Sequence, residues 1–239
     1  IWKGLVGSEM CIRDSYKMKE LNKIKYWIFD LDNTLYSATT NVFGKIDKKM
    51  CEFIMENLKV PRDEALKIKN EYFHNHGTTL NGLMKKHDID AHHFLEFVHD
   101  IDYDFLKENP KLNQQIKKLP GEKIIFTNGS KKHAERVIER LGIENNFEKI
   151  FDIVDCDFIP KPEVEPYQKL VKKFNIECEK SIFFEDIARN LEPAYNMRMK
   201  TAWIESNDPY CKKGFDGNHI NYTVKNLTDF LKQTNESIG

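Results

Sequence analysis

The stretch KYWIFDLDNTLY, residues 25–36, combines an apolar run with two aspartates. The apolar residues 25–29 predict a buried strand. Side chains alternate along an extended chain, so Asp30 and Asp32 point toward one side and Leu31 points away. Open parallel sheets bind ligands at the carboxyl ends of their strands, which makes this end a candidate site. A solvated acidic turn that begins a helix would give the same short pattern.

Four more apolar runs follow along the chain and are predicted to be strands. They cover residues 123–127, 150–154, 181–184 and 201–204. Between most of them apolar residues recur with helical spacing, as at 132–141 and 166–174, and a last helix is expected at 227–232. Strands that alternate with helices predict an α/β fold with a Rossmann-like core built on a doubly wound parallel sheet.

A segment of different character interrupts this alternation between the first two predicted strands. Apolar residues throughout residues 39–116 recur with helical spacing, beginning with Phe43, Ile46 and Met50. This spacing predicts an all-helical domain that is inserted into the core. We therefore expect residues 18–38 and 117–239 to form the core and residues 39–116 to form a helical cap.

The first 17 residues show neither helical nor strand periodicity. Within them, SEMCIRDS at residues 8–15 matches the translation of a transposon adaptor used to prepare sequencing libraries. We therefore expect residues 1–17 to be non-native and the protein to start at Met18. A genuine disordered tail is the alternative.

The composition excludes several classes of partner. The hydrophobic fraction of 40% suffices for a sizeable core, and the net charge is only −1. With no excess of either charge and no apolar run that could span a bilayer, we expect neither a nucleic acid polymer nor a membrane as partner. The five cysteines are scattered without metal-binding spacing, which indicates reduced thiols and a cytoplasmic location. We expect a monomer or a homodimer.

Polar residues also follow the second and third predicted strands. Thr127 and Asn128 end the second strand, where a hydroxyl and free backbone N–H groups can bind phosphoryl oxygens as a helix begins. An ordinary helix cap by Asn128 or Ser130 is the alternative, and it does not exclude this function. Lys161 follows the third strand beside Pro162, although a single loop lysine is usually only solvated.

Glu185 and Asp186 end the fourth predicted strand. An acidic pair in such a place is costly when it is buried without a partner. Four strands thus each end in groups suited to phosphate and Mg²⁺, in the order Asp-x-Asp, Thr, Lys and Glu-Asp. This joint pattern is far more specific than any one of its parts.

These four segments resemble the four motifs of the haloacid dehalogenase superfamily, from about Lys25 to the fifth predicted strand. The helical insert lies where that family carries its first type of cap domain. A closer resemblance is to the pyrimidine 5'-nucleotidase branch. It rests on residues 27–36, 126–128, 132–137, 183–186 and 189–190, and less specifically on residues 72–83 of the cap.

The resemblance implies covalent catalysis. Asp30 attacks phosphorus and becomes an aspartyl phosphate, while Asp32 protonates the leaving oxygen and then activates water. Thr127, the Asn128 backbone and Lys161 bind the phosphoryl oxygens and offset charge in the transition state.

The resemblance also implies a Mg²⁺ cofactor. The ion is held by Asp30, the backbone carbonyl of Asp32 and Asp186, while Glu185 acts through water or orients Asp186. Many relatives carry Asp in place of Glu185, whose longer side chain can shift one water of the metal. Relatives usually have Gly where Arg198 stands, and a left-handed conformation of Arg198 would cost about 1 kcal/mol.

The implied function is hydrolysis of a small phosphorylated metabolite, and the expected substrate is a pyrimidine nucleoside 5'-monophosphate. The alternatives are a phosphatase for a sugar phosphate or phosphoglycolate, a phosphomutase, and a non-catalytic phosphate-binding protein. Six of the eight histidines lie between His74 and His99, and we expect them on the polar faces of cap helices. One exception stays open: His74, His76 or Asn81 lining the cap side of the cleft.

Overall fold

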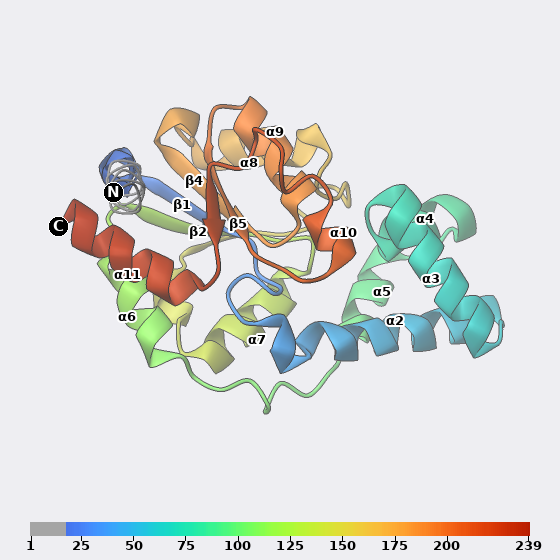
Figure 1. Ribbon diagram of the computed structural model, residues 1–239. Coiled ribbons are helices and arrows are strands. Elements are labelled where there is room, and N and C mark those ends of the chain that lie inside the picture. Colours follow the sequence, from blue (N-terminus) through green and yellow to red (C-terminus); the bar gives the residue numbers. More distant parts are fainter. Residues whose placement is uncertain (1–17) are drawn as a thin grey trace, which may run out of the picture.

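The computed structural model describes residues 18–239 and has a six-stranded sheet at its centre (Figure 1). All neighbouring strands are parallel, in the order β3-β2-β1-β4-β5-β6. The strands are β1 (Tyr26–Phe29), β2 (Glu122–Phe126), β3 (Lys149–Phe151), β4 (Ser181–Glu185), β5 (Lys200–Ile204) and β6 (Tyr222–Val224). The predicted α/β fold is confirmed, with one strand, β6, that the sequence pattern did not predict.

Strand β1 occupies the middle of the sheet because its side chains are apolar on both faces. Trp27, Ile28 and Phe29 have no exposed surface, as expected for a parallel sheet that is covered on both sides. Phe29 lies in register with Ile125 of β2 and with Phe184 of β4. The carboxyl ends of these three strands consequently lie side by side, and the residues that follow them share one edge of the sheet.

Helices cover both faces of the sheet (Figure 1). Those of the core are α6 (Pro110–Lys118), α7 (Lys131–Leu141), α8 (Val164–Phe174), α9 (Glu192–Asn196), α10 (Pro209–Lys212) and α11 (Leu227–Ile238). The short 3-10 helices are η1 (Glu20–Lys23), η2 (Ala38–Thr40), η3 (Glu144–Asn146), η4 (Cys178–Lys180) and η5 (Ala188–Leu191). In Figure 1, α6, α7 and α11 lie on one side of the sheet, and α8 and α9 lie on the other.

Four helices between β1 and β2 form a separate layer at one end of the core (Figure 1). They are α2 (Val42–Leu58), α3 (Arg62–His76), α4 (Thr79–His87) and α5 (Ala91–Val98). Phe53 of α2 packs against Phe94 and Phe97 of α5, with ring centroids 5.1 and 5.4 Å apart. Burial of such apolar faces stabilises short helices more than helix propensity does. A helical insert is thus present where the spacing predicted one.

Helix α6 lies within the predicted insert by sequence but packs on the core. Residues 99–109 leave the cap without forming a helix or strand, and α6 then contacts α11. Asn235 of α11 donates to the backbone carbonyl of Gln115 in α6 at 3.0 Å. The boundary expected after residue 116 falls inside this helix, because apolar spacing alone does not show which surface a helix packs against.

Two predicted elements end at different residues in the structure. The third strand stops at Phe151 rather than Val154, because the Asp152 carboxylate accepts from the Val154 N–H at 3.1 Å and forms a turn. The last helix, predicted to end at residue 232, continues to the end of α11, where Thr234 is also buried.

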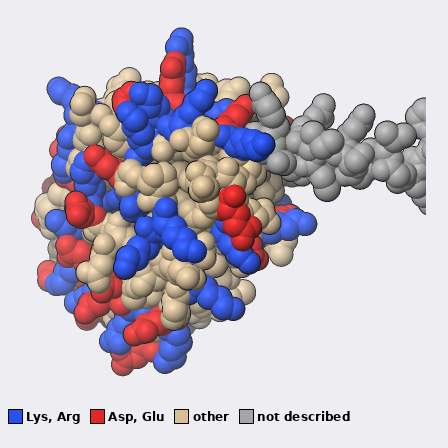
Figure 2. All heavy atoms as spheres, turned by 90° about the vertical axis from the view of Figure 1, so that its left-hand side faces the viewer, with Lys and Arg blue, Asp and Glu red and all other residues tan. Residues whose placement is uncertain are grey.

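The surface agrees with the small net charge of −1. On the face shown in Figure 2, basic and acidic side chains are interspersed. Within residues 18–239, no helix is long and apolar enough to cross a membrane. The cysteines of this part are all free: Cys51, Cys156, Cys178 and Cys211. The prediction that residues 1–17 are non-native concerns a segment outside the described residues.

Candidate active site

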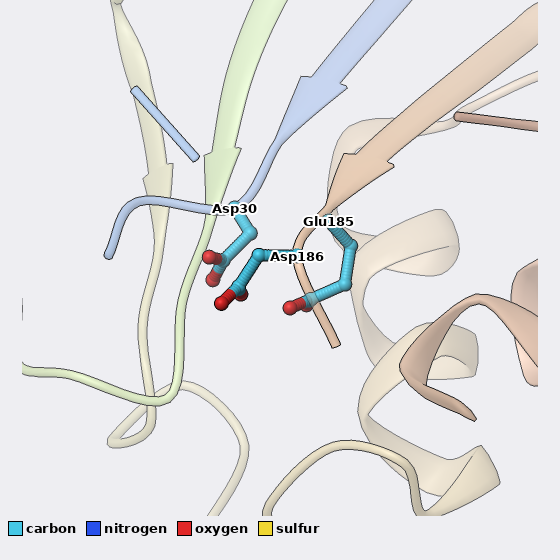
Figure 3. A group of neighbouring side chains, drawn as sticks. All are labelled: Asp30, Glu185 and Asp186. Atoms are coloured by element: carbon cyan, nitrogen blue, oxygen red, sulfur yellow. The ribbon is translucent and has the colours of Figure 1, made fainter. Parts of the chain in front are cut away.

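Three carboxylates meet at the edge of the sheet where β1 and β4 end (Figure 3). Asp30 directly follows β1, and its N–H donates to the carbonyl of Phe184 at 2.9 Å, which extends the strand pairing. Glu185 ends β4, and Asp186 follows it. Carboxylate oxygens of the three acidic residues lie within 4.8 Å of one another, and their exposed fractions are only 6%, 1% and 5%. The fold thus brings together acidic groups that are far apart in the sequence.

Lys161 lies among these carboxylates and is also buried. Its Nζ is 2.7 Å from Asp30 Oδ1, 2.6 Å from Glu185 Oε2 and 3.0 Å from the carbonyl oxygen of Phe126. Burial by itself lowers the pKa of Lys161, but the two carboxylates raise it above its ordinary value. The loop after β3 therefore delivers a charged amine to this edge of the sheet.

One lysine does not neutralise three buried carboxylates. If all are ionised, two excess negative charges remain where little water can reach. Burial, and then the charge of Glu185, raise the pKa of Asp30 to about 7. The same two causes raise the pKa of Asp186 well above its ordinary value. Mg²⁺ prefers hard oxygen ligands, so this cluster of carboxylates fits such an ion and would be relieved by it.

The end of β2 supplies polar groups next to Asp30. Thr127 is buried, and its Oγ1 accepts from the Gly129 N–H at 2.9 Å. Asn128 Oδ1 accepts from the backbone N–H of Lys161 at 2.9 Å. The Asn128 side chain thus ties the lysine loop to the end of β2, which the sequence did not predict. Thr127 and the Asn128 backbone stay candidates for binding phosphoryl oxygens.

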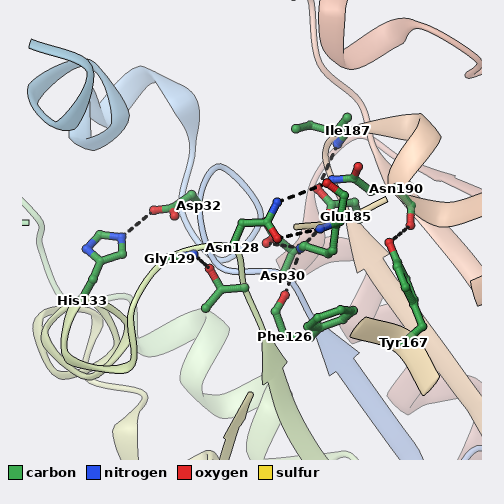
Figure 4. Close-up of polar contacts among 12 residues, drawn as sticks. Asp30, Asp32, Phe126, Asn128, Gly129, His133, Tyr167, Glu185, Ile187 and Asn190 are labelled. Carbon is green, nitrogen blue, oxygen red and sulfur yellow. Dashed lines mark hydrogen bonds and ion pairs between the residues drawn. The ribbon is translucent and has the colours of Figure 1, made fainter. Parts of the chain in front are cut away.

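The Asp32 side chain contacts His133 and Tyr36, and Figure 4 shows it turned toward His133 and away from Asp30 and Glu185. His133 Nε2 lies 2.8 Å from Asp32 Oδ1, and the Tyr36 hydroxyl donates to the same oxygen. Burial opposes ionisation of Asp32, but His133 and the hydrogen bonds hold its pKa below the ordinary value. Asp30 and Asp32 line one cavity, as their spacing predicted.

Sequence reasoning missed Tyr36 and His133 as partners of Asp32. Both lie in segments that carry the family resemblance, so the sequence did mark them as part of a motif. Their contacts with Asp32 became visible only with the fold, because His133 is 101 positions away along the chain.

The expectation that cap histidines lie on polar helix faces is wrong for His99. This residue is buried, its ring stacks on that of His133 with centroids 4.4 Å apart, and its Nδ1 lies 2.9 Å from Ser130 Oγ. Burial, and then His133, lower the pKa of His99 to about 3, so the ring stays neutral. A signal existed in the sequence, because His99 follows Leu95 by four positions and shares its buried helix face.

A cavity of about 570 Å³ connects these residues with the cap. Its cap side is largely apolar and is lined by Phe43, Ile46, Met50, Phe73, Leu80, Phe94, Leu95 and Val98. His74 also lines it, as the sequence allowed. His76 and Asn81 are not among its lining residues, and the Asn81 side chain instead donates to the His76 carbonyl at 2.8 Å.

Further hydrogen bonds fix the turn after β4. Trp203 Nε1 donates to the carbonyl of Asp186 at 2.7 Å. Glu185 Oε1 accepts from the Ile187 N–H at 3.2 Å, while its Oε2 contacts Lys161. Both oxygens of Glu185 therefore have partners inside the protein (Figure 4). Its length lets it reach Lys161, which leaves Asp30 and Asp186 as the carboxylates best placed to bind a cation directly.

The comparisons with known proteins agree on one family. Residues 27–204 match the sequence model of the family described as haloacid dehalogenase-like hydrolase. The chain is 28% identical over 193 residues to phosphate metabolism protein 8 of Saccharomyces cerevisiae, a match that covers 73% of this chain and 60% of the yeast protein. It is 26% identical over 201 residues to glyceraldehyde 3-phosphate phosphatase of Pyrococcus furiosus, a match that covers 77% of this chain and 82% of that protein.

Solved structures show the same fold at low sequence identity. A haloacid dehalogenase-type (HAD) phosphatase from Thermococcus onnurineus superposes with a TM-score of 0.58 at 18% identity, covering 87% of this chain and 97% of that one. The HAD-hydrolase YfnB from Bacillus subtilis, bound to magnesium, superposes with a TM-score of 0.54 at 15% identity, covering 90% and 99%. At these identities the likeness concerns the fold alone.

Proposed function

The chain belongs to the haloacid dehalogenase-like hydrolase family, and on this premise we propose that it is a Mg²⁺-dependent phosphatase acting through Asp30. The observation that carries the proposal is the buried group of Asp30, Lys161, Glu185 and Asp186, with Asp32 beside it on the same cavity. A binding protein for phosphate would not require an acid–base group next to a buried nucleophile. We therefore favour catalysis over phosphate binding alone.

The proposed reaction has two steps. An Asp30 oxygen bonds to phosphorus while the bond from phosphorus to the ester oxygen breaks, and Asp32 gives its proton to that leaving oxygen. A water then attacks phosphorus, its proton passes to Asp32, and the bond to Asp30 breaks to release phosphate. Lys161 and Thr127 offset the charge on the phosphoryl oxygens in both steps.

Asp30 and Asp186 are the residues that would hold Mg²⁺, together with the backbone carbonyl of Asp32. When bound, the ion neutralises negative charge on the phosphoryl group and the carboxylates. It would also lower the pKa of Asp30, which burial raises to about 7, and so keep this nucleophile ionised.

The proposed substrate is a pyrimidine nucleoside 5'-monophosphate. Support comes from the resemblance of residues 27–36, 183–186 and 189–190 to the pyrimidine 5'-nucleotidase branch. The cavity adds support, because its size of about 570 Å³ and its apolar cap side suit a flat base above the phosphate. A second candidate is glyceraldehyde 3-phosphate, the substrate named for the archaeal relatives.

The test is release of inorganic phosphate from a panel that contains UMP, CMP, AMP, GMP, glyceraldehyde 3-phosphate and phosphoglycolate. We expect the fastest release from UMP and CMP, with Mg²⁺ required and activity lost on chelation. Asp30→Asn is the matched control, because an amide of the same size is a poor nucleophile and a weak metal ligand. Preference for glyceraldehyde 3-phosphate would move the assignment to the second candidate, and full activity after chelation would refute the metal-dependent mechanism.

A covalent intermediate offers an independent check. Asp32→Asn keeps the nucleophile but removes both the acid of the first step and the base of the second. With p-nitrophenyl phosphate, whose leaving group needs no acid, phosphorylated Asp30 should therefore accumulate in this variant. Mass spectrometry after a rapid quench would locate the phosphate. Phosphate on any other residue would show that the nucleophile has been misassigned.

A further inference from the structure

A histidine that the two proposed steps do not use is buried beside Asp32. His133 lies in the first turn of α7, which begins at Lys131 after the N-cap residue Ser130. Ser130 Oγ accepts from the His133 N–H at 3.3 Å, and the His133 side chain has no exposed surface. The start of the helix thus fixes the backbone of His133, and packing fixes its ring.

Both ring nitrogens of His133 have partners. Nε2 lies 2.8 Å from Asp32 Oδ1 (Figure 4), and Nδ1 lies 2.8 Å from the Tyr103 hydroxyl oxygen. An ionised carboxylate only accepts hydrogen bonds, so Nε2 carries a proton and donates to Asp32. The Tyr103 hydroxyl donates its one proton either to the His99 carbonyl, 3.2 Å away, or to Nδ1, and in the first case its oxygen accepts from Nδ1–H. In both arrangements Nε2 keeps the proton that it donates to Asp32. The stacked ring of His99, 4.4 Å away between centroids, restricts rotation of the imidazole.

These contacts distinguish the two oxygens of Asp32. Oδ1 accepts from both His133 and Tyr36. Oδ2 lies toward Gly129, 3.7 Å from the position that a Cβ atom on Gly129 would take. Gly129 and Asp32 both line the cavity, and Thr127, a candidate for binding phosphoryl oxygens, contacts Gly129, so we take Oδ2 as the oxygen that faces a bound phosphoryl group.

We propose that His133 is a positioning residue that directs Oδ2 of Asp32 toward the ester oxygen of the substrate. This inference rests on the proposed function. The negative charge of a bound phosphate ester favours the protonated form of Asp32, with the proton on Oδ2 and Oδ1 still accepting from His133. In the first step, this proton passes to the leaving oxygen as its bond to phosphorus breaks and the Asp30 oxygen bonds to phosphorus. In the second step, Oδ2 takes the proton of the attacking water and the aspartyl phosphate bond breaks. His133 keeps its hydrogen bond to Oδ1 throughout and gives up no proton.

A purely structural role for His133 predicts something different. Loss of packing alone would lower the activity toward all substrates by a similar factor. Loss of positioning should lower activity most where the leaving oxygen needs a proton, as in a nucleoside monophosphate. It should matter little for phosphoryl transfer from p-nitrophenyl phosphate, whose leaving group departs as a stable anion.

The experiment compares His133→Leu, which has no donor, with His133→Gln, which keeps an N–H donor. The substrate is UMP, or the best nucleotide or sugar phosphate of the panel. For His133→Leu we expect kcat to fall roughly 10–100-fold at unchanged KM, which is less than the full contribution of a general acid–base group because Asp32 is still present. The pre-steady-state burst of p-nitrophenol should slow by less than about threefold, because this step needs no general acid. His133→Gln should recover a large part of the lost kcat.

Tyr103→Phe provides a milder variant if His133→Leu does not fold. It keeps the His133 ring and its packing but removes the hydroxyl that contacts Nδ1 and helps to hold the ring, so a smaller fall with the same leaving-group dependence is expected. The thermal unfolding temperature and the Mg²⁺ affinity of Tyr103→Phe, both measured by calorimetry, should stay close to those of the wild type.

Two results would overturn the inference. One is that His133→Leu slows turnover of the nucleotide or sugar phosphate and the p-nitrophenol burst by the same factor, and the other is that His133→Gln is no more active than His133→Leu. Either result would leave the wild type active as a phosphatase. Failure of the proposed function is a separate outcome, in which the wild type with Mg²⁺ releases phosphate from no ester, including p-nitrophenyl phosphate.

Discussion

Arg198 has a left-handed backbone conformation that residues other than glycine rarely adopt. It lies between α9 and β5 with a φ of 69°, and its N–H donates to the Tyr195 carbonyl at 2.8 Å. The left-handed conformation considered from the sequence is thus present. The Arg198 side chain offers little in return, because its ion pair with Glu179 has both partners largely exposed.

Arg198→Gly should therefore stabilise the protein. Relief of the left-handed strain outweighs the greater freedom of glycine in the unfolded chain, so a net gain of about 0.5–1 kcal/mol in the free energy of unfolding is expected. Arg198→Ala is the control, since it removes the same ion pair but keeps the strain, and it should not stabilise. Urea denaturation measures both, and equal stability of the two variants would contradict a backbone origin.

For single residues, the sequence predicted which side chains lie at the active-site edge of the sheet better than it predicted their hydrogen-bond partners. Asp30 and Lys161 could be located because each follows an apolar strand, and parallel strands place such residues at one edge. The contact between His133 and Asp32 could not be predicted, since it depends on how α7 packs near the end of β1. The same limit applies to Asn128, whose side chain binds the Lys161 backbone instead of only capping a helix.

Among the elements, α11 joins the end of the chain to the sheet. Its N-cap Asn226 accepts from the Asp229 N–H at 3.0 Å, and its buried face includes Leu231. Phe230 packs edge-on against Phe184 of β4 at a centroid distance of 5.8 Å. This helix therefore holds in place the strand that ends in Glu185.

Leu231→Ala should destabilise the protein strongly. Leu231 has no exposed surface, and truncation of a buried leucine to alanine costs about 2–5 kcal/mol through lost burial and the remaining cavity. The neighbouring Lys232→Ala is the matched control, because its side chain is exposed and the change should stay within about 0.5 kcal/mol. Similar losses in both variants by urea denaturation would mean that α11 does not contribute a buried face.

The elements that the sequence predicted well are the long apolar ones. Strands β1, β2, β4 and β5 have continuous apolar runs that only a buried position explains. Strand β6 has three residues, with Thr223 exposed between buried neighbours, and so lacked such a run. Where a helix ends or which surface it covers depends on its packing partner, as for α6 against α11.

For the molecule as a whole, the candidate active site lies between the core and the cap helices. The sequence predicted these two parts but not how they pack against each other. The strand order that joins the four motifs follows from general rules for α/β sheets. The cavity forms because helices α2 to α5 pack over this edge of the sheet. Their packing determines which apolar side chains line it. The cap side could therefore be predicted as helical, but its lining residues could not be named with the same success.

The buried carboxylates should make the metal-free protein less stable as the pH rises. In the folded state the pKa of Asp30 is raised to about 7 and that of Asp186 is raised well above its ordinary value. Between about pH 4 and 7 the folded protein then binds more protons than the unfolded chain, so this contribution to stability is lost with rising pH, by up to about 1.4 kcal/mol per pH unit for each proton. His99 acts oppositely, because its pKa is lowered to about 3 and its contribution grows with rising pH.

Comparison with Asp186→Asn isolates the carboxylate contribution, because His99 is present in both proteins. In chelator at pH 7, Asp186→Asn should be more stable than the wild type, because it removes a carboxyl whose raised pKa costs folding free energy at that pH, and the difference should shrink toward pH 5. With Mg²⁺ at 100 times its dissociation constant, the wild type should gain about 2.7 kcal/mol, so the stability advantage of Asp186→Asn should shrink by up to about that amount. Urea denaturation of both proteins, in chelator at pH 5 and at pH 7 and with Mg²⁺ at pH 7, measures these differences. If Asp186→Asn is the less stable protein in chelator at pH 7, the buried carboxylates do not destabilise the metal-free protein as their raised pKa values predict.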